Sequence, residues 1–412
     1  MGLSLDRASF DRLPPVVGGV NRVVLIVMDG VGIGRLDGGG LDPGANTLRS
    51  VLAAVGFDLE LPSLSGLGLR DLLHPPDSRW PAGPPLRPAG TRARLVPISQ
   101  GKDSLTGHWE LAGLITDVEM RTFPAGFPPE LLSQLEAALG CGLLGGKPAS
   151  GTEIIARLGP EHLKTRKPII YTSADSVLQI AAHDDVLAPE ELYRLSEAAR
   201  EVVKGPWLVG RVIARPFTGE PGRFKRTPGR RDYSLPPPAP TVLDEAKAAG
   251  VSVVGVGKIA DVFAGQGISR SLKPSGNSGV MAALAELLAV PADCGRRELV
   301  LANLNDFDTV YGHRRDPSGF ASALQEFDDW LGVALRGLRP SELLVVTADH
   351  GCDPAYHGTD HTHEDVPMLI AGAGWKPADL GVIEGLNAVA GLTSAALDLE
   401  GFAHWPRVGR QG

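Results

Sequence analysis

Four short, mostly apolar runs constrain the fold of this 412-residue chain more than any other feature. The runs are residues 23–28, 251–256, 299–304 and 343–348. Runs of this length without a regular polar alternation are typical of strands covered on both faces, as in the parallel sheets of α/β proteins. Asp29 directly follows the first run, and Asp349 directly follows the last. The pattern predicts an α/β fold with a mostly parallel sheet sandwiched by helices.

Acidic and imidazole side chains gather near the predicted carboxyl ends of these strands, which is where open parallel sheets bind their ligands. Six residues could form a two-metal centre, namely Asp29, Asp308, His313, Asp349, His350 and His361. A mixed set of carboxylates and imidazoles suits manganese, zinc or iron better than the all-oxygen sites of calcium or magnesium. His357 and His363 flank His361, and spacing alone does not choose among these three histidines.

Composition and charge exclude several classes of protein. The formal net charge of −8 argues against general nucleic-acid binding, which requires a basic face. We expect neither a membrane span nor a secretion signal, because no apolar stretch is long enough for either. The cysteines Cys141, Cys294 and Cys352 are scattered and odd in number, which fits a reducing compartment better than a disulfide framework. A cytoplasmic protein is therefore expected.

The order of the runs predicts one domain inserted into another. Runs that end in candidate ligands occupy the first and last parts of the chain, whereas the middle differs in character. We expect a metal-binding catalytic core from residues 1–119 and 236–412, interrupted by a smaller α/β cap at residues 120–235. Periodicity within the cap predicts helices at 129–139 and 188–203 and strands at 169–171 and 207–213. The proline-rich stretch 235–240 predicts a stiff, extended connector.

The segment Gly101–Glu110 contains two hydroxyl groups that a metal centre could activate. A bound metal lowers the pKa of a serine or threonine hydroxyl, and a second metal stabilises the opposing oxygen in an in-line phosphoryl displacement. Ser104 and Thr106 both fit that role. The alternative is a polar loop before a helix, in which Ser104 serves only as the N-cap.

The stretch from Arg211 to Arg231 concentrates positive charge in an otherwise acidic protein. It contains seven basic residues and the single acid Glu220. Because arginine guanidinium groups match the geometry of phosphate oxygens, this stretch indicates an anion-binding surface. The alternative is a solvated basic loop.

Seven blocks of the chain together carry a resemblance to a known family. They are Gly101–Glu110, Ala149–Glu153, Tyr171–Gln179, Arg211–Phe217, Asp306–Asp316, Thr347–Gly351 and Gly358–Thr362. In these blocks the chain resembles phosphopentomutases of the alkaline phosphatase superfamily. The resemblance implies an isomerase, specifically an intramolecular phosphotransferase, that interconverts ribose 1-phosphate and ribose 5-phosphate and likewise the 2-deoxyribose pair. It also implies an alkaline-phosphatase-like core split by a mobile, substrate-binding cap.

The resemblance also implies roles for individual residues. Asp29, Asp349 and His350 match the ligands of one metal. Asp308, His313 and His361 match those of the other. Two Mn²⁺ ions are expected, with other divalent metals as substitutes. Ser104 matches the phosphoacceptor, which also bridges both metals, although familiar members have threonine there and Thr106 stays an alternative.

Substrate contacts are implied for five further residues, namely Ser173, Asp175, Arg211, Arg230 and Lys258. Ser173 and Asp175 match positions that contact the sugar, and Lys258 would reach the distal phosphate. Familiar members have histidine at the position of Arg231, so the role of Arg231 stays open.

The implied mechanism passes through a phosphorylated Ser104, which donates its phosphoryl group to the sugar monophosphate. The resulting bisphosphate then returns its other phosphoryl group to the enzyme. Glucose 1,6-bisphosphate or ribose 1,5-bisphosphate is the expected activator. The expected partners are small sugar phosphates, with no nucleic acid and no membrane, and the chain is expected to be a monomer or a weak oligomer. The alternatives are a metal-dependent phosphatase, an enzyme like cofactor-independent phosphoglycerate mutase, or a non-catalytic sugar-phosphate sensor on the same scaffold.

Overall fold

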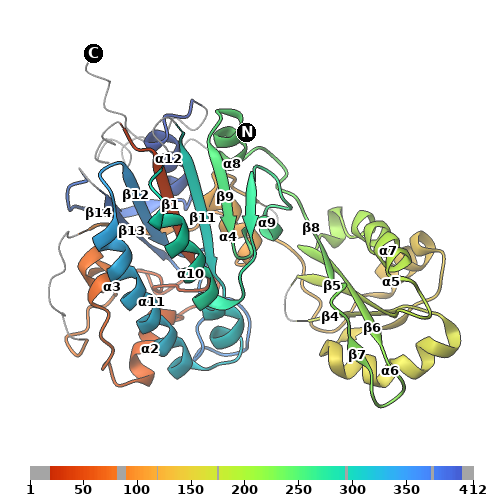
Figure 1. The fold of residues 1–412 in the computed structure, drawn as a ribbon. Coiled ribbons are helices and arrows are strands. Elements are labelled where there is room, and N and C mark those ends of the chain that lie inside the picture. The colour runs from red at the N-terminus through yellow and green to blue at the C-terminus, as the bar shows by residue number, and fades with distance from the viewer. Residues whose placement is uncertain are drawn as a thin grey trace. The chain divides into compact units, whose positions relative to one another are not determined.

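The computed structural model describes residues 19–80, 90–117, 119–173, 176–292, 296–372 and 375–400. Contacts divide the chain into two compact units (Figure 1). Unit 1 comprises Met1–Val118 and Pro237–Gly412, and unit 2 comprises Glu119–Pro236. Two residues discussed above, Asp175 and Cys294, lie outside the described residues.

Unit 1 is built on an eight-stranded sheet with the strand order β10-β9-β11-β1-β12-β13-β2-β14. Its strands are β1 (Arg22–Met28), β2 (Thr91–Val96), β9 (Ser252–Val256), β10 (Arg270–Leu272), β11 (Glu298–Leu304), β12 (Glu342–Thr347), β13 (Val366–Gly372) and β14 (Asp379–Glu384). Only β13 runs opposite to the other seven strands of this described sheet. The predicted α/β fold class with a mostly parallel sheet is confirmed.

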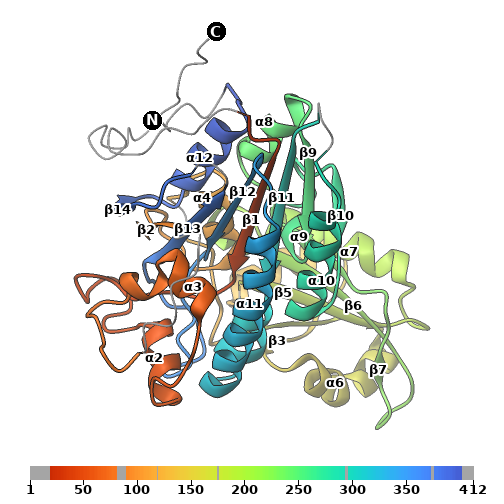
Figure 2. The ribbon, with the colours of Figure 1, turned by 60° about the vertical axis from the view of Figure 1, so that its left-hand side comes forward.

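Helices cover both faces of this sheet (Figure 2). One layer contains α2 (Thr47–Ala54), α3 (Pro62–Leu67), α10 (Gly276–Ala289) and α11 (Pro317–Gly337). The other contains α4 (Ser104–Leu111), α8 (Val242–Ala248) and α12 (Ala388–Ala396), which enclose a small pocket against β1 and β11. The remaining helical segments of unit 1 are η1 (Leu69–Leu72), α9 (Ile259–Val262) and η3 (Phe307–Gly312).

The centre of the sheet explains why the apolar runs were readable in the sequence. Every residue of β1 and β12 is buried, because each strand has a neighbour on both sides and helices on both faces. The register pairs Val27 with both Thr347 and Asn303. Asp29 lies two residues beyond Val27, and Asp349 lies two residues beyond Thr347. The strands β1 and β12 therefore end at the same level of the sheet. Parallel pairing therefore brings the two carboxylates to one edge.

Unit 2 contains a six-stranded mixed sheet in the order β3-β4-β5-β6-β7, with β8 also paired to β6. Its strands are β3 (Leu144–Pro148), β4 (Ile169–Thr172), β5 (Val177–His183), β6 (Arg211–Thr218), β7 (Lys225–Arg226) and β8 (Arg231–Ser234). Its helices are α5 (Pro129–Leu139), α6 (Gly151–Thr165), α7 (Pro189–Val202) and η2 (Gly205–Trp207). Helices α5 and α7 pack in one apolar cluster and α6 in another, so the two faces of the sheet have separate cores.

The elements predicted for this region are mostly confirmed. The helix predicted at 129–139 is α5, the helix predicted at 188–203 is α7, and the strand predicted at 169–171 is β4. The prediction of a strand at 207–213 was wrong for the first half of that range. Gly205 has a left-handed backbone and Pro206 lacks an N–H group, so this part of the chain forms the 3₁₀ turn η2 and the strand begins only at Arg211.

Candidate active site

The first group of candidate ligands lies where β1 and β12 end. Asp29, Asp349 and His350 are all buried, and each offers one ligand atom within 4.8 Å of the others. The Nε2 atom of His350 lies 3.5 Å from Asp29 Oδ1 and 3.3 Å from Asp349 Oδ2. The other oxygen of Asp349 accepts hydrogen bonds from the backbone N–H groups of Gly30 and His350. The hydrogen bond from Gly30 to Asp349 thus connects the loop after β1 to the loop after β12.

The second group converges on Asp308, which lies in η3 after β11. The Nε2 atoms of His313 and His361 both lie 3.3 Å from Asp308 Oδ1. The segment η3 is a single π-helical turn, a geometry found frequently at functional sites. The rings of His350 and His361 are 4.2 Å apart between centroids, so the two groups adjoin.

Backbone carbonyls fix the orientation of two of the imidazoles. The Nδ1–H of His313 donates to the carbonyl of Thr359 at 2.6 Å, and the Nδ1–H of His350 donates to that of Gly351 at 3.1 Å. Each ring therefore presents its Nε2 to the carboxylates. A backbone partner on one ring nitrogen, with the other nitrogen directed at carboxylates, is typical of metal-binding histidines.

The segment Gly101–Glu110 places its two hydroxyl groups in different environments. The helix α4 begins at Ser104, and Asp103 is the N-cap, because its Oδ1 accepts hydrogen bonds from Leu105 N and Thr106 N. The Oγ1 of Thr106 donates to Asp103 Oδ2 at 2.7 Å. Ser104 Oγ instead lies 3.2 Å from His350 Nε2 and 3.4 Å from Asp29 Oδ1. The hydroxyl of Ser104, rather than that of Thr106, faces the candidate ligands.

A glycine lets α4 approach the cluster this closely. A Cβ atom on Gly107 would collide with the backbone carbonyl of Asp349. The helix that carries Ser104 therefore packs directly against the loop that carries two candidate ligands.

The electrostatics of the cluster favour a divalent cation. Burial and the neighbouring charge of Asp349 raise the pKa of Asp29. Burial would also raise the pKa of Asp308, but the charges of His361 and His313 hold it well below its ordinary value. Asp308 Oδ1 is buried and accepts no hydrogen bond within the described residues. Buried carboxylates crowded in this way are normally paired or bound to a metal, and the donor set fits such a metal.

Three other potential ligands are less well placed. His357 is exposed and lies against Tyr356, and the backbone N–H of His363 donates to Asp42. Neither residue belongs to a described group that could hold a metal, whereas His361 does. Cys352 lies near Asp308 and His313, but burial and the charge of Asp308 raise the pKa of its thiol strongly. A thiol that stays protonated is a poor ligand.

Two residues beneath the cluster were missed by sequence reasoning. His108 Nδ1 lies 3.0 Å from Asp349 Oδ2 and 2.8 Å from the carbonyl of Ser104. Asn303 Nδ2 donates to Asp29 Oδ2 at 2.9 Å and lies 3.0 Å from His108 Nε2. Together they connect the two buried carboxylates. The available signal was a single polar residue, Asn303, inside the apolar run 299–304.

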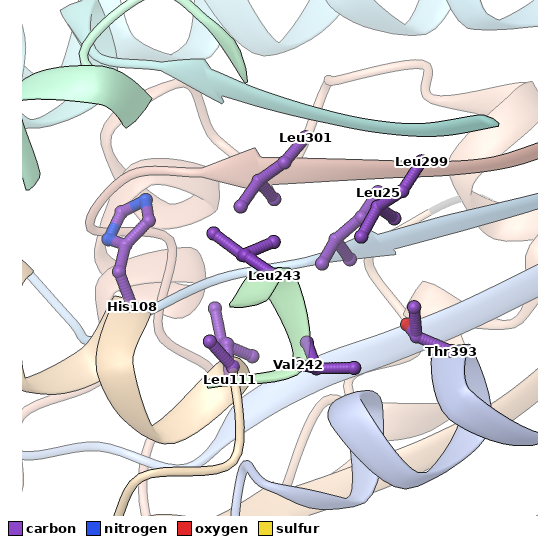
Figure 3. A pocket seen from close by; sticks show the side chains of 9 residues that line it. Leu25, His108, Leu111, Val242, Leu243, Leu299, Leu301 and Thr393 are labelled. Carbon is purple, nitrogen blue, oxygen red and sulfur yellow. The ribbon is translucent and has the colours of Figure 1, made fainter. Parts of the chain in front are cut away.

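Figure 3 shows His108 at one end of a small pocket whose other lining side chains, such as Leu25 and Leu243, are almost all apolar. Among the described residues, the polar partners of this imidazole are Ser104, Asp349 and Asn303. A low-dielectric surrounding of this kind strengthens the hydrogen bonds of His108 to its partners.

Lys258 lies just beyond the end of β9. Its Nζ is 3.9 Å from Asp29 Oδ2, and it lines a cavity of about 200 Å³ together with Lys273, Asn303 and Asn305. The cavity offers polar donors and acceptors immediately beside the candidate ligands.

In unit 2, two of the predicted substrate contacts, Arg211 and Arg230, lie beside the same carboxylate. Arg230 makes two hydrogen bonds to Asp232, at 2.6 and 2.5 Å, and Arg211 lies 3.9 Å from the same carboxylate. Ser173 follows the end of β4 and is half-buried. Arg231 points to the opposite side, because its guanidinium stacks 3.8 Å from the ring centroid of Tyr193 on α7. The substitution at position 231 therefore lies away from Arg211.

Within the described residues, no helix has both the length and the apolar character that crossing a bilayer requires.

Comparisons with known proteins identify the family. A model of the metalloenzyme superfamily matches residues 21–400. A phosphopentomutase of Caldanaerobacter subterraneus is 49% identical over 85% of this chain and 87% of its own length. A phosphopentomutase of Syntrophotalea carbinolica is 48% identical over 92% of this chain and 95% of its own length.

Among solved structures, the PH0037 protein of Pyrococcus horikoshii matches 95% of this chain and all of its own chain, with 16% identity and a TM-score of 0.48. The superfamily match and the ligand groups support the use of a divalent metal. The chain belongs to the phosphopentomutase family of isomerases, within the metalloenzyme superfamily.

Proposed function

We propose that this enzyme interconverts ribose 1-phosphate and ribose 5-phosphate, and likewise the 2-deoxyribose phosphates, through a phosphorylated Ser104. The observation that carries the proposal is the position of Ser104 Oγ, within 3.4 Å of both Asp29 and His350 at the first ligand group. The names of the relatives supply the substrate class.

The proposed centre holds two divalent cations, for which Mn²⁺ is the expected metal. Asp29, Asp349 and His350 would hold one. Asp308, His313 and His361 would hold the other. Bound there, the cations would supply charge stabilisation for a transferring phosphoryl group.

Ser104 alternates between its free and phosphorylated forms. The phosphoserine transfers its phosphoryl group to the free hydroxyl of the sugar monophosphate, and the bond from Ser104 Oγ to phosphorus breaks as the new ester forms. The sugar bisphosphate then presents its other phosphate, which Ser104 Oγ attacks, and the isomeric monophosphate leaves. Because a bisphosphate that escapes leaves the serine unphosphorylated, glucose 1,6-bisphosphate or ribose 1,5-bisphosphate would prime the enzyme.

Unit 2 would supply substrate recognition. Ser173, Asp175 and Arg211 would contact the sugar phosphate together with Arg230, and Lys258 of unit 1 would contact a phosphate. We further propose that the enzyme acts in the cytoplasm, as a monomer or weak oligomer, on small sugar phosphates alone.

The test supplies the purified enzyme with Mn²⁺, ribose 5-phosphate and glucose 1,6-bisphosphate, and follows ribose 1-phosphate and free phosphate together. Formation of ribose 1-phosphate that depends on the bisphosphate is the expected result. Free phosphate as the sole product would indicate a phosphatase, and turnover of phosphoglycerate alone would indicate the other mutase. Binding of the sugar phosphate without any turnover would indicate a sensor.

A second arm addresses the metal. The enzyme is stripped with a chelator and reloaded with Mn²⁺, Zn²⁺, Mg²⁺ or Co²⁺, and metal content and activity are measured for each. Two bound Mn²⁺ per chain with the highest activity is expected. A single bound ion at full activity would contradict the two-metal proposal.

A further inference from the structure

A closed ring of polar contacts links Asp29 to the helix that carries Ser104. Asn303 Nδ2 lies 2.9 Å from Asp29 Oδ2 and 3.0 Å from His108 Nε2. His108 Nδ1 in turn lies 2.8 Å from the backbone carbonyl oxygen of Ser104, and Ser104 Oγ lies 3.4 Å from Asp29 Oδ1. The ring therefore joins the loop after β1, the carboxyl end of β11 and the first turn of α4.

The carboxylate of Asp29 fixes the orientation of the Asn303 amide. An asparagine side chain donates only through its nitrogen, so turning the amide over would bring Oδ1 against an ionised carboxylate oxygen. In the observed orientation, Asn303 Oδ1 is buried and has no hydrogen-bond partner among the described residues. Because a buried polar atom without a partner is costly, the contacts of Nδ2 are what maintain this orientation.

The amide in turn fixes the tautomer of His108. One N–H of Asn303 Nδ2 donates to Asp29, and the second donates to His108 Nε2, which is therefore the unprotonated ring nitrogen. The proton of the neutral imidazole is then on Nδ1, which donates to the carbonyl of Ser104. Asp349 Oδ2 also lies 3.0 Å from this nitrogen.

Burial removes other possible partners for these groups. Asn303 is 0% exposed and His108 is 1% exposed. A half-turn of the imidazole about its Cβ–Cγ bond would put carbon atoms against Asn303 and Ser104, and both hydrogen bonds would be lost. Side chains such as Leu111 and Leu301 line the pocket beside the imidazole and cannot replace these bonds (Figure 3). A buried network of this kind rigidifies the groups that it connects.

We infer that Asn303 and His108 are positioning residues, which hold the carboxylate of Asp29 and the hydroxyl of Ser104 in one rigid unit. Asn303 would orient Asp29 toward the cation of the first ligand group, because hydrogen-bond partners of a ligating carboxylate set its orientation. His108 would hold the first turn of α4, so that Ser104 Oγ stays beside Asp29. The inference rests on the proposed function in one respect, which is the phosphorylation of Ser104.

Metal binding tests Asn303 without any turnover. Mn²⁺ is titrated by calorimetry into the metal-free full chain, and Asn303→Leu should weaken the binding of one ion by about 10- to 100-fold. The other ion should bind as in the wild type, which shows that the variant is folded. Asn387→Leu is the matched control, because Asn387, at the start of α12, also has a buried Oδ1 without a partner. Unchanged affinity for both ions in Asn303→Leu, or equal weakening of both, would overturn the role of Asn303.

Two substitutions of similar shape test His108. Asparagine places its amide nitrogen near the position of Nδ1, whereas glutamine places its amide near the position of Nε2. His108→Asn can therefore still donate to the carbonyl of Ser104, but His108→Gln keeps only the contact with Asn303. At saturating Mn²⁺, His108→Gln should slow the phosphorylation of Ser104 by glucose 1,6-bisphosphate about 10²-fold, and His108→Asn should stay within about tenfold of the wild type.

The order of these two rates separates positioning from packing. If the imidazole only fills space, the smaller asparagine is the more damaging substitution. Equal rates in the two variants, or a slower rate in His108→Asn, would therefore overturn the role of His108. His162→Gln is the control and should leave the rate unchanged, because His162 is a buried histidine of unit 2 whose two ring nitrogens also have backbone partners.

The two experiments distinguish failure of the inference from failure of the proposed function. If Ser104 of the wild type is not phosphorylated, the proposed function fails, while the Mn²⁺ titration of Asn303→Leu still decides whether Asn303 orients Asp29. If the wild type is phosphorylated but neither set of variants behaves as expected, the proposed function stands and the inference is overturned.

Discussion

The candidate metal centre of unit 1 and the cationic surface of unit 2 are built in opposite ways. In unit 1, five of the six candidate ligands are buried, and backbone carbonyls hold two of the rings. In unit 2, Arg230 and Arg226 are exposed, and the carboxylate of Asp232 lies beside both Arg211 and Arg230. Positional precision is concentrated in the first region and adaptable charge in the second.

The difference corresponds to two physical requirements. Phosphoryl transfer depends on groups held in place before the reaction, because reorganising dipoles during the reaction adds to the barrier. Under the proposed function, recognition of the sugar phosphate would need donors that can follow a substrate as it turns. Long arginine side chains have the rotamer freedom to do so. Substitutions in the two regions should therefore affect different kinetic quantities.

The largest effect is expected at Ser104. Ser104→Ala removes the proposed phosphoacceptor and should lower kcat by about 10⁴-fold or more. Thr106→Val should change kcat by less than about tenfold, because its hydroxyl is engaged with Asp103 rather than with the cluster. Phosphopeptide mapping after incubation with labelled bisphosphate gives the direct readout. Label on Thr106 would contradict the assignment.

A somewhat smaller effect is expected for the ligands themselves. Asp308→Asn removes a charge from the point on which two imidazoles converge, and should lower the metal content and reduce kcat by about 10³-fold. Metal content is measured by plasma mass spectrometry after dialysis. Asp37→Asn, which changes an exposed carboxylate, is the matched control and should keep the full metal content. Full occupancy in Asp308→Asn would exclude this residue as a ligand.

Substitution in unit 2 should change substrate affinity without changing metal content. Arg211→Met should raise the KM for ribose 5-phosphate by about 10- to 100-fold and leave kcat within about tenfold. Arg231→Met should have a much smaller effect, because that guanidinium stacks on Tyr193 on the other side of the sheet. An equal rise in KM for Arg211→Met and Arg231→Met would contradict the proposal that only the face of the sheet carrying Arg211 binds the substrate.

The smallest effect concerns the pH dependence of stability in unit 1. Burial raises the pKa of Glu364 to about 7, although the carboxylate accepts hydrogen bonds from Thr47 and Gly34. The raised pKa means that the fold favours the neutral form, so the contribution of Glu364 to stability is lost as the pH rises through about 7.

Glu364→Gln removes this titration, and the stability of the variant relative to the wild type should increase by about 1–2 kcal/mol between pH 5.5 and 7.5. Chemical unfolding at several pH values measures the difference. Glu190→Gln, at an exposed position on α7, should give a difference that does not vary with pH. A pH-independent difference for Glu364→Gln would show that the carboxyl is ionised in the folded protein throughout this range.

Much of the fold was predictable because burial on both faces makes the central strands apolar along their whole length. The strands β1 and β12 are buried on both faces, so their sequences are apolar whatever surrounds them. The strands β2 and β14 lie near and at one edge of the sheet. They contain both buried and more exposed residues, and the sequence did not predict them. Their pairing depends on segments far away in the chain, since β2 pairs with both β13 and β14.

The family, the α/β class and the set of acids and histidines at the strand ends could be predicted from the chain alone, because apolar runs and short motifs consist of neighbouring residues. The folded structure was needed to show that Ser104 and not Thr106 faces the cluster, and that Arg231 points away from Arg211. The physical reason is that the direction of a side chain is set by contacts across the fold. Ser104 and His350, which are 246 residues apart in sequence, illustrate this.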